Sequence, residues 1–140
     1  MNRPGDPPTV DWAALHREAL AAQAEAYAPY SRFAVGAALL GVDGRIYRGC
    51  NVENVSYGLT VCAERNAIGH AVVSGTRGFL ALVVVTPASS PVVPCGMCRQ
   101  VLAEFLPSFP VRAYAGGGML ETTVEALLPH AFEPDDLGRG

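Results

Sequence analysis

Lysine is absent from this sequence of 140 residues, and charged residues make up only 16% of it. All 10 basic residues other than histidine are arginines, they stand apart from one another, and the formal net charge is −3. A protein that grips a phosphate backbone usually carries a basic patch, so a long nucleic acid is not the expected partner. Half of the residues are hydrophobic, which excludes an intrinsically disordered chain.

Long hydrophobic runs are also missing. The longest, Phe33–Val42 and Phe79–Val85, are far shorter than the ~18 residues that a membrane span needs, so no membrane is expected as a partner. The segment Met1–Val10 is polar and rich in proline and does not resemble a secretory signal. We therefore expect a cytoplasmic protein, in which the 4 cysteines stay reduced and bind a metal or take part in catalysis.

The sequence pattern predicts one domain in which helices and strands alternate. Asp11 is the expected N-cap of a first helix that runs to about Tyr27, because apolar residues recur there at steps of three and four. A hairpin is expected around Asp43-Gly44. This order of elements indicates an α/β sheet with helices on both faces. The hairpin strands are expected at Phe33–Leu40 and Arg45–Cys50, further strands at Phe79–Val85 and Val111–Ala115, and further helices at Cys62–Val73, Pro94–Leu106 and Thr123–Leu128, with a turn at Gly116–Gly118.

Three cysteines have spacings that suit a single metal ion. Cys95 and Cys98 are two residues apart, so both sulfurs can bind one metal from a single turn. Cys62 and this pair stand at predicted helix starts, where backbone N–H groups and the helix dipole favour thiolates. Three thiolates with an open fourth position are typical of a catalytic zinc. Cys50 offers a fourth thiolate for a closed structural site, but its wide spacing from Cys62 favours a buried, inert thiol.

Two charged residues follow the first of these cysteines. Glu64 lies two residues after Cys62 and is expected to point toward the open side of the metal without binding it. A carboxylate in that place can take a proton from zinc-bound water and pass it on. Three thiolates on Zn²⁺ leave a net charge of about −1, which Arg65 is placed to offset by donating to the sulfurs. An ordinary solvated helix arginine is the alternative for Arg65.

A resemblance to a known family rests on these motifs and on others. The order Cys-x-Glu followed by Pro-Cys-x-x-Cys is the signature of the zinc-dependent nucleobase deaminases. Over roughly Asp11 to Phe132 the chain resembles the small homotetrameric cytidine deaminases. The segments that carry this resemblance are Phe33–Ala38, Gly49–Gly58, Cys62–Ala67 and Pro94–Gln100.

The resemblance implies a three-layer fold of the cytidine deaminase type, with a central mixed five-stranded sheet and helices on both faces. It implies a catalytic domain at 11–132. The residues outside that range are expected to form a flexible N-terminal tail at 1–10 and a C-terminal tail at 133–140. One Zn²⁺ per chain would be held by Cys62, Cys95 and Cys98, and the catalytic glutamate falls on Glu64.

The same resemblance implies a set of substrate-binding residues. The pair that grips the ribose falls on Asn51 and Glu53, and the ring that stacks on the pyrimidine falls on Phe33. The backbone at Ala63 would meet the polar edge of the pyrimidine. The aromatic residues that reach the site of a neighbouring subunit in a homotetramer fall on Tyr57 and Phe132.

The expected function is hydrolytic deamination of cytidine and deoxycytidine in pyrimidine salvage. A deaminase of another cytosine nucleoside, such as blasticidin S, is one alternative, and a non-catalytic zinc module is another. Editing of single-stranded nucleic acid is disfavoured by the acidic pI of about 5.5 and by the lack of basic clusters. Simpler roles remain open for four of these residues. Phe33 could be plain core, and Glu53 could be a loop charge. Tyr57 and Phe132 could be packing residues within one chain.

Overall fold

A mixed five-stranded sheet forms the centre of the molecule, as predicted. The computed structural model describes residues 9–105 and 107–138. The strands are β1 (Gly36–Gly41), β2 (Ile46–Cys50), β3 (Phe79–Val85), β4 (Pro110–Ala115) and β5 (Gly118–Thr123). They lie in the order β2-β1-β3-β4-β5, and neighbours are antiparallel except for the parallel pair of β3 and β4.

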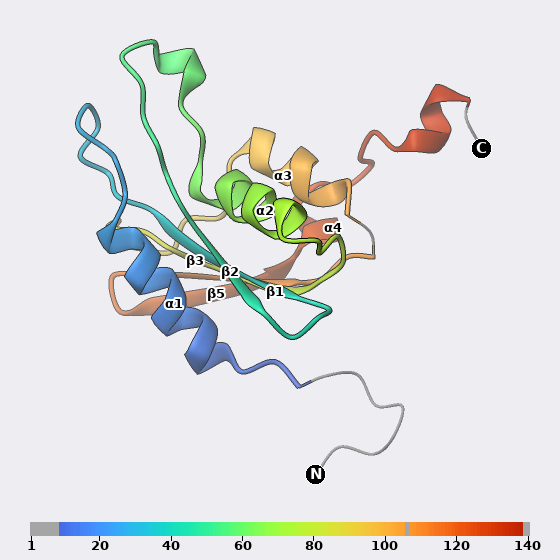
Figure 1. Ribbon diagram of the computed structural model, residues 1–140, viewed down its shortest axis with the longest axis horizontal. Helices are drawn as coiled ribbons and strands as arrows, with labels where there is room; N and C mark the ends of the chain where they lie inside the picture. The colour runs from blue at the N-terminus through green and yellow to red at the C-terminus, as the bar shows by residue number, and fades with distance from the viewer. Residues whose placement is uncertain (1–8, 106, 139–140) are drawn as a thin grey trace.

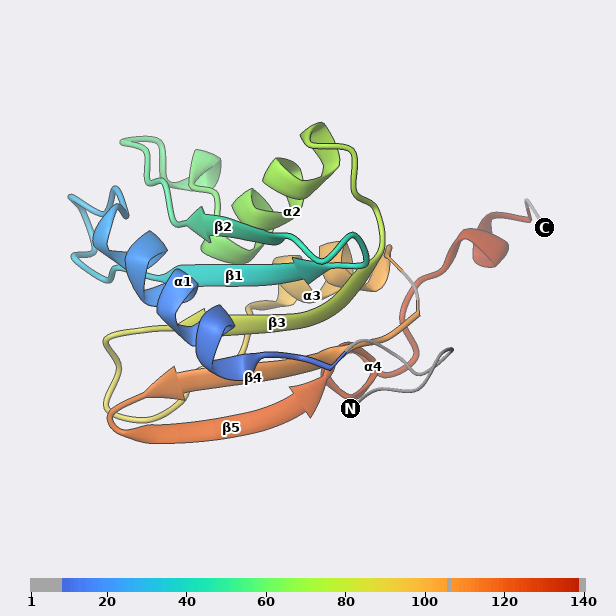
Figure 2. The same ribbon diagram turned by 60° about the horizontal axis from the view of Figure 1, so that its bottom comes forward.

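Helices cover both faces of this sheet, which confirms the three-layer arrangement. Figures 1 and 2 show α1 on one face and α2 with α3 on the other. One apolar core cluster joins α1 to the sheet through residues such as Leu15 and Val83, and a second joins α2 and α3 to the opposite face through residues such as Ile68 and Leu102. The helices are α1 (Trp12–Ala24), α2 (Ala63–Val73), α3 (Gly96–Ala103) and α4 (Val124–Leu127), with 3-10 turns at Tyr57–Leu59 and Pro134–Leu137.

The first helix begins as predicted but ends earlier. Asp11 Oδ1 accepts a hydrogen bond from the backbone N–H of Ala14 at 3.0 Å, which confirms the N-cap. The predicted end at about Tyr27 is wrong, since α1 ends at Ala24. The physical reason is that Tyr27 leaves the helix to form a β-bridge with Val52.

The hairpin is present, but its first strand starts later than expected. Gly44 has a φ of 83° in the turn, a conformation that glycine adopts without strain. Strand β1 starts at Gly36 rather than Phe33. The Asn51 side chain holds the backbone just before it, because Asn51 Nδ2 donates to Phe33 O at 2.8 Å and Val35 N donates to Asn51 Oδ1 at 2.9 Å. One backbone bond, from Asn51 N to Val35 O at 3.3 Å, accompanies these contacts.

The buried strand Phe79–Val85 occurs with the predicted bounds as β3. It is parallel only to β4, because its other neighbour, β1, runs antiparallel to it. The helix expected at Pro94–Leu106 is shorter and covers Gly96–Ala103, with Cys95 as its N-cap. Leu106 lies outside the described residues.

The C-terminal part of the chain differs most from expectation. The segment Gly118–Thr123 is the edge strand β5. The sequence pattern predicts only a turn at its start and the beginning of a helix at its end. Helix α4 is limited to Val124–Leu127. Beyond it the chain runs outward as an arm that carries the 3-10 turn Pro134–Leu137 (Figure 1).

Met1–Pro8, part of the expected N-terminal tail, lies outside the described residues. Among the described helices, none has the length and apolar character that a membrane crossing requires.

Candidate active site

The structure brings the sulfurs of Cys62, Cys95 and Cys98 within 4.8 Å of one another. Cys62 is the N-cap of α2, Cys95 is the N-cap of α3, and Cys98 lies in the first turn of α3. The sulfurs of Cys62 and Cys95 are 3.7 Å apart. Two thiolates on one tetrahedral zinc, each with a bond of about 2.3 Å, stand about 3.8 Å apart. The cluster therefore has the donor type and the spacing that a zinc ion requires.

Charge in this cluster favours a thiolate before any metal binds. The hydrogen bond from Cys98, followed by the contact with Arg65, lowers the pKa of Cys62 to about 5. The same contact with Cys62 and burial raise the pKa of Cys98, because the two thiols share one proton in preference to losing both. Arg65 Nη2 lies 3.6 Å from Cys62 Sγ and 3.4 Å from Thr60 O. Arg65 is thus turned toward the sulfurs, and its buried Nε finds no partner among the described residues.

Glu64 lies next to the cluster in the first turn of α2, with only 5% of its surface exposed. Burial, aided by the negative charge at Cys62, raises the pKa of Glu64 to about 7. A carboxyl group with that pKa can both accept and release a proton near neutral pH, which suits a general acid and base.

A cavity of about 400 Å³ opens beside these residues. Its wall includes Glu64, Cys62 and Cys95, so the metal cluster and the buried carboxyl face the same space. The volume falls in the range of small-molecule sites. The other predicted substrate-binding residues that line it are Phe33, Asn51, Glu53 and Ala63.

Asn51 and Glu53 make contacts that the sequence does not reveal. Asn51 holds the backbone on both sides of Ala34, as described above. Glu53 accepts hydrogen bonds from Tyr30 N at 2.9 Å, from Ser31 N at 3.1 Å and from the hydroxyl of Ser31. Ser31 also lines the cavity, and no motif in the sequence distinguishes it from an ordinary turn serine.

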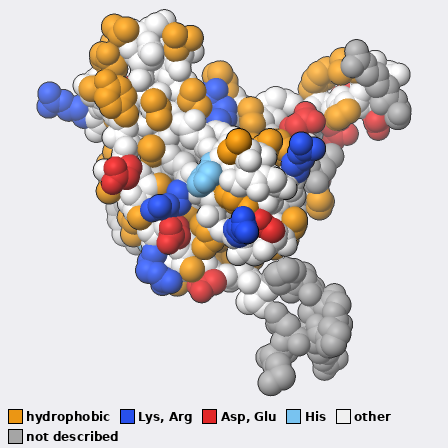
Figure 3. All heavy atoms as spheres, viewed as in Figure 1, with side chains coloured by type: hydrophobic (Ala, Val, Ile, Leu, Met, Phe, Trp, Pro, Cys, Tyr) orange, Lys and Arg blue, Asp and Glu red, His pale blue; other side chains and the backbone are white. Residues whose placement is uncertain are grey.

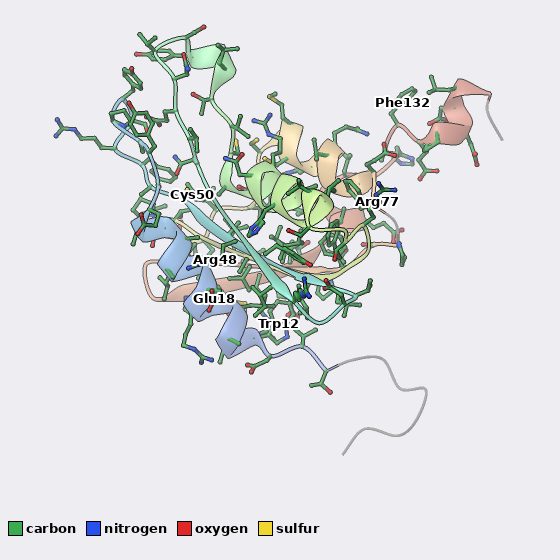
Figure 4. The ribbon with its side chains drawn as sticks, in the orientation of Figure 1. Trp12, Glu18, Arg48, Cys50, Arg77 and Phe132 are labelled. Carbon is green, nitrogen blue, oxygen red and sulfur yellow. The ribbon has the colours of Figure 1, made fainter. Side chains whose placement is uncertain are left out.

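Phe33 is not a core residue, since 37% of its surface is exposed and it borders the cavity. Tyr57 and Phe132 do not line the cavity of their own chain and are 75% and 60% exposed. Phe132 lies on the C-terminal arm (Figure 4), where its backbone carbonyl accepts a hydrogen bond from Gln100 Nε2 of α3 at 3.2 Å. Tyr57 lies in the 3-10 turn Tyr57–Leu59, on a loop that projects from the molecule (Figure 1). Exposed hydrophobic side chains gather on this projecting part (Figure 3).

A larger groove of about 1170 Å³ lies between α4 and the C-terminal arm. Its lining includes neither the three clustered cysteines nor Glu64. The chemistry therefore points to the smaller cavity. Cys50 stands outside the three-sulfur cluster and is half-buried.

Comparison with known proteins identifies the family of this chain. Residues 11–109 match the family model described as the cytidine and deoxycytidylate deaminase zinc-binding region. The chain belongs to this family. It is 52% identical over 130 residues to a cytidine deaminase of Sporosarcina psychrophila, covering 91% of this chain and 96% of the relative. It is 50% identical over 137 residues to one of Mycobacterium tuberculosis, covering 94% and 97%.

Solved structures of cytidine deaminases have the same fold. The enzyme of Burkholderia pseudomallei superposes with a TM-score of 0.84 at 46% identity, covering 88% of this chain and 100% of that one. The enzyme of Mycobacterium tuberculosis gives 0.77 at 48% identity, covering 89% and 98%. Members of this family are zinc-dependent hydrolases, and the three-sulfur cluster of this deaminase fits one zinc ion per chain.

Proposed function

We propose that this enzyme hydrolyses cytidine and deoxycytidine to uridine and deoxyuridine, with release of ammonia, in pyrimidine salvage. The observation that carries the proposal is one cavity lined by Glu64, two of the three clustered cysteines and the pair Asn51 and Glu53. A metal module used only for folding has no need of a buried carboxyl with a pKa near 7 beside the cluster. The curated relatives of similar length are named cytidine deaminases, which supports cytidine as a substrate.

The reaction adds water at C4 of the pyrimidine and expels the amino group. Zinc held by Cys62, Cys95 and Cys98 would lower the pKa of a water in the cavity toward neutrality. Glu64 takes one proton from the attacking water and delivers it to N3. It then takes the proton of the hydroxyl added at C4 and passes it to the amino nitrogen, so that the C4 carbonyl forms as ammonia leaves. Arg65 offsets the negative charge of the three thiolates.

The base is held by groups at the start of α2 and by the loop before β1. The backbone of Ala63 lies in the first helical turn, where N–H groups have no partner inside the helix. It is placed to bond the polar edge of the pyrimidine. Phe33 borders the same cavity and presents a partly exposed ring for stacking.

The sugar pair has hydrogen-bonding capacity to spare. Asn51 Nδ2 uses one of its two protons on Phe33 O, so one donor remains. Glu53 accepts three hydrogen bonds, two at Oε1 and one at Oε2, so about one of its four acceptor positions remains, on Oε2. A hydroxyl that donates to Glu53 and accepts from Asn51 satisfies both groups at once. This ribose-type pair favours an ordinary nucleoside over blasticidin S.

Charge around the cavity favours a nucleoside over a nucleotide. Among the described residues that line it, two are carboxylates, Glu53 and Glu64, and none is basic. A phosphate there would meet repulsion without a cation to offset it. The same property disfavours deoxycytidylate and single-stranded nucleic acid as substrates.

The test is the loss of ultraviolet absorbance of cytidine with purified protein, beside a zinc count per chain. We expect turnover of cytidine and deoxycytidine with one zinc per chain, and at least about 100-fold lower kcat/KM for deoxycytidylate. A zinc-loaded protein without turnover of either nucleoside contradicts the proposal. Preference for deoxycytidylate would contradict the charge argument.

We also propose that the enzyme is a cytoplasmic homotetramer with its sites at subunit contacts. Tyr57 and Phe132 are exposed and absent from the cavity of their own chain, which supports a role in the site of a neighbour. Removal of residues from His130 onward should raise KM strongly while zinc stays bound. An active monomer in sedimentation, unaffected by this truncation, contradicts the proposal. All four cysteines are free, as a reducing compartment maintains them.

A further inference from the structure

The loop before β1, residues 28–35, is held by hydrogen bonds within itself and by hydrogen bonds to one carboxylate, that of Glu53. Arg32 N donates to Ala28 O at 2.9 Å, and Arg32 has a φ of 57°, in the left-handed region that non-glycine residues seldom adopt. Such a conformation persists only when its surroundings hold it. The loop bends tightly between Ser31 and Phe33, so these two residues stand close together although one belongs to the sugar side and the other to the base side of the cavity.

Glu53 is the group that holds this loop from outside. One of its oxygens accepts from the backbone of Tyr30 and Ser31, at 2.9 and 3.1 Å, and the other accepts from the hydroxyl of Ser31. These bonds, led by the one from the Ser31 side chain, lower the pKa of Glu53. The carboxylate is therefore oriented before a sugar arrives, with one oxygen fixed by two backbone donors.

The Ser31 hydroxyl links Glu53 to the backbone of Phe33, the residue whose ring borders the base side of the cavity. It donates to Glu53 Oε2, and it accepts from the backbone N–H of Phe33 at 3.0 Å. A hydroxyl carries one donor and two acceptor positions, so both bonds form together without competition. One side chain thus connects the carboxylate that faces the sugar with the backbone of the residue that faces the pyrimidine.

We infer that Ser31 is a positioning residue that fixes Glu53 and Phe33 relative to each other, so that the sugar and the base of one nucleoside can contact these two residues at the same time. This inference rests on the proposed function of the site. Ser31 does not take part in proton transfer, and its effect passes through Glu53 and Phe33. It acts on binding rather than on chemistry, because the sugar and stacking contacts exist in the ground state as well as in the transition state.

The test compares Ser31→Ala with Ser31→Thr and with Ser108→Ala. Ser31→Ala removes the hydroxyl, and we expect KM for cytidine to rise about tenfold, the loss typical of a hydrogen bond to a charged group, with kcat changed less than about twofold. Ser31→Thr keeps the hydroxyl at an exposed position and should restore KM to within about twofold of the parent. Ser108→Ala is the matched control, because the Ser108 hydroxyl also accepts from a backbone N–H at 3.0 Å but lies outside the cavity.

A second measurement asks whether the effect passes through the carboxylate. Ser31→Ala is made again in a Glu53→Ala background, where we expect it to raise KM by less than about half of its effect in the parent. A full effect in that background, or a parent-like KM in the single variant, overturns the inference. A fall in kcat with loss of zinc or of thermal stability makes Ser31 structural and overturns it too. If the parent enzyme turns over no cytidine, the proposed function fails instead.

Discussion

Substituting Gly49 tests how closely the sheet supports the active-site helix. Gly49 lies in β2 beneath the start of α2, and a Cβ built on it would stand 2.2 Å from Ala63 O and 2.4 Å from Ala67 N. Both are backbone atoms, so no side chain can turn aside. The helix must move by about 1 Å before these contacts become ordinary. That helix has Cys62 as its N-cap and carries Glu64 in its first turn.

The expected cost of Gly49→Ala is about 3 kcal/mol of unfolding free energy, at the upper end for an overpacked core. A displacement of about 1 Å at a catalytic group also lowers kcat/KM by about 100-fold in the fraction that folds. Urea unfolding of the zinc-loaded protein measures the first effect, and cytidine turnover measures the second.

Gly69→Ala is the matched control on the same helix. Apart from its chain neighbours and the backbone of its own helix, a Cβ at Gly69 meets no atom within 4 Å. Because alanine is also the better helix former, we expect a gain of about 0.5–1 kcal/mol with unchanged turnover. Equal stability and equal turnover in Gly49→Ala and the parent would refute the argument that β2 fixes the position of the helix.

Three further predictions concern the metal cluster and the hairpin. Cys50→Ser should keep one zinc per chain and most of the activity, because the three-sulfur cluster does not include Cys50; zinc loss in this variant would show that the ligand set is wrong. Arg65→Gln should leave the fold intact but weaken zinc binding, measured by chelator competition, and lower kcat, because it removes the cation beside the thiolates. Unchanged zinc affinity and kcat would make Arg65 a surface residue. Hydrogen bonds from Thr76 and Tyr47 lower the pKa of Asp43 to about 2, so its contribution to stability is present above pH ~4 and is lost as the pH falls toward 2. Asp43→Asn should therefore flatten this part of the pH profile of urea unfolding, and an unchanged profile would refute the prediction.

The elements that the sequence predicts best are those whose pattern has a local cause. The run Phe79–Val85 is uniformly apolar because it is buried on both faces, and it occurs with the predicted bounds. The N-cap at Asp11 depends only on its own side chain and the first turn of the helix. The edge strand β5 could not be found in this way, because nearly all of its residues are exposed and no alternation of apolar and polar residues marks it.

In the active site, too, the features with a local cause are predicted from the sequence and those that depend on tertiary contacts are not. The clustering of Cys62 with the Cys95 pair follows from short motifs at helix starts, and the structure brings the three sulfurs together. The contacts of Asn51 and Glu53 with the loop before β1 depend on a left-handed residue and on a serine hydroxyl, which no spacing rule reveals. Tertiary hydrogen bonds of this kind become visible only in the folded chain.

Glu64→Gln tests the central claim most directly. Glutamine is nearly the same shape and can still bond the nucleoside, but it cannot accept and deliver protons. Proton transfer by a placed side chain is worth about 10²–10⁴-fold, and because Glu64 serves several transfers, kcat should fall by about 10⁴-fold or more at equal zinc loading. KM, zinc content and thermal stability should stay near those of the parent, since Glu64 lies beside the sulfur cluster and is not part of it. Near-normal turnover of cytidine by Glu64→Gln would contradict the account, and loss of zinc or of the fold would make Glu64 a structural residue.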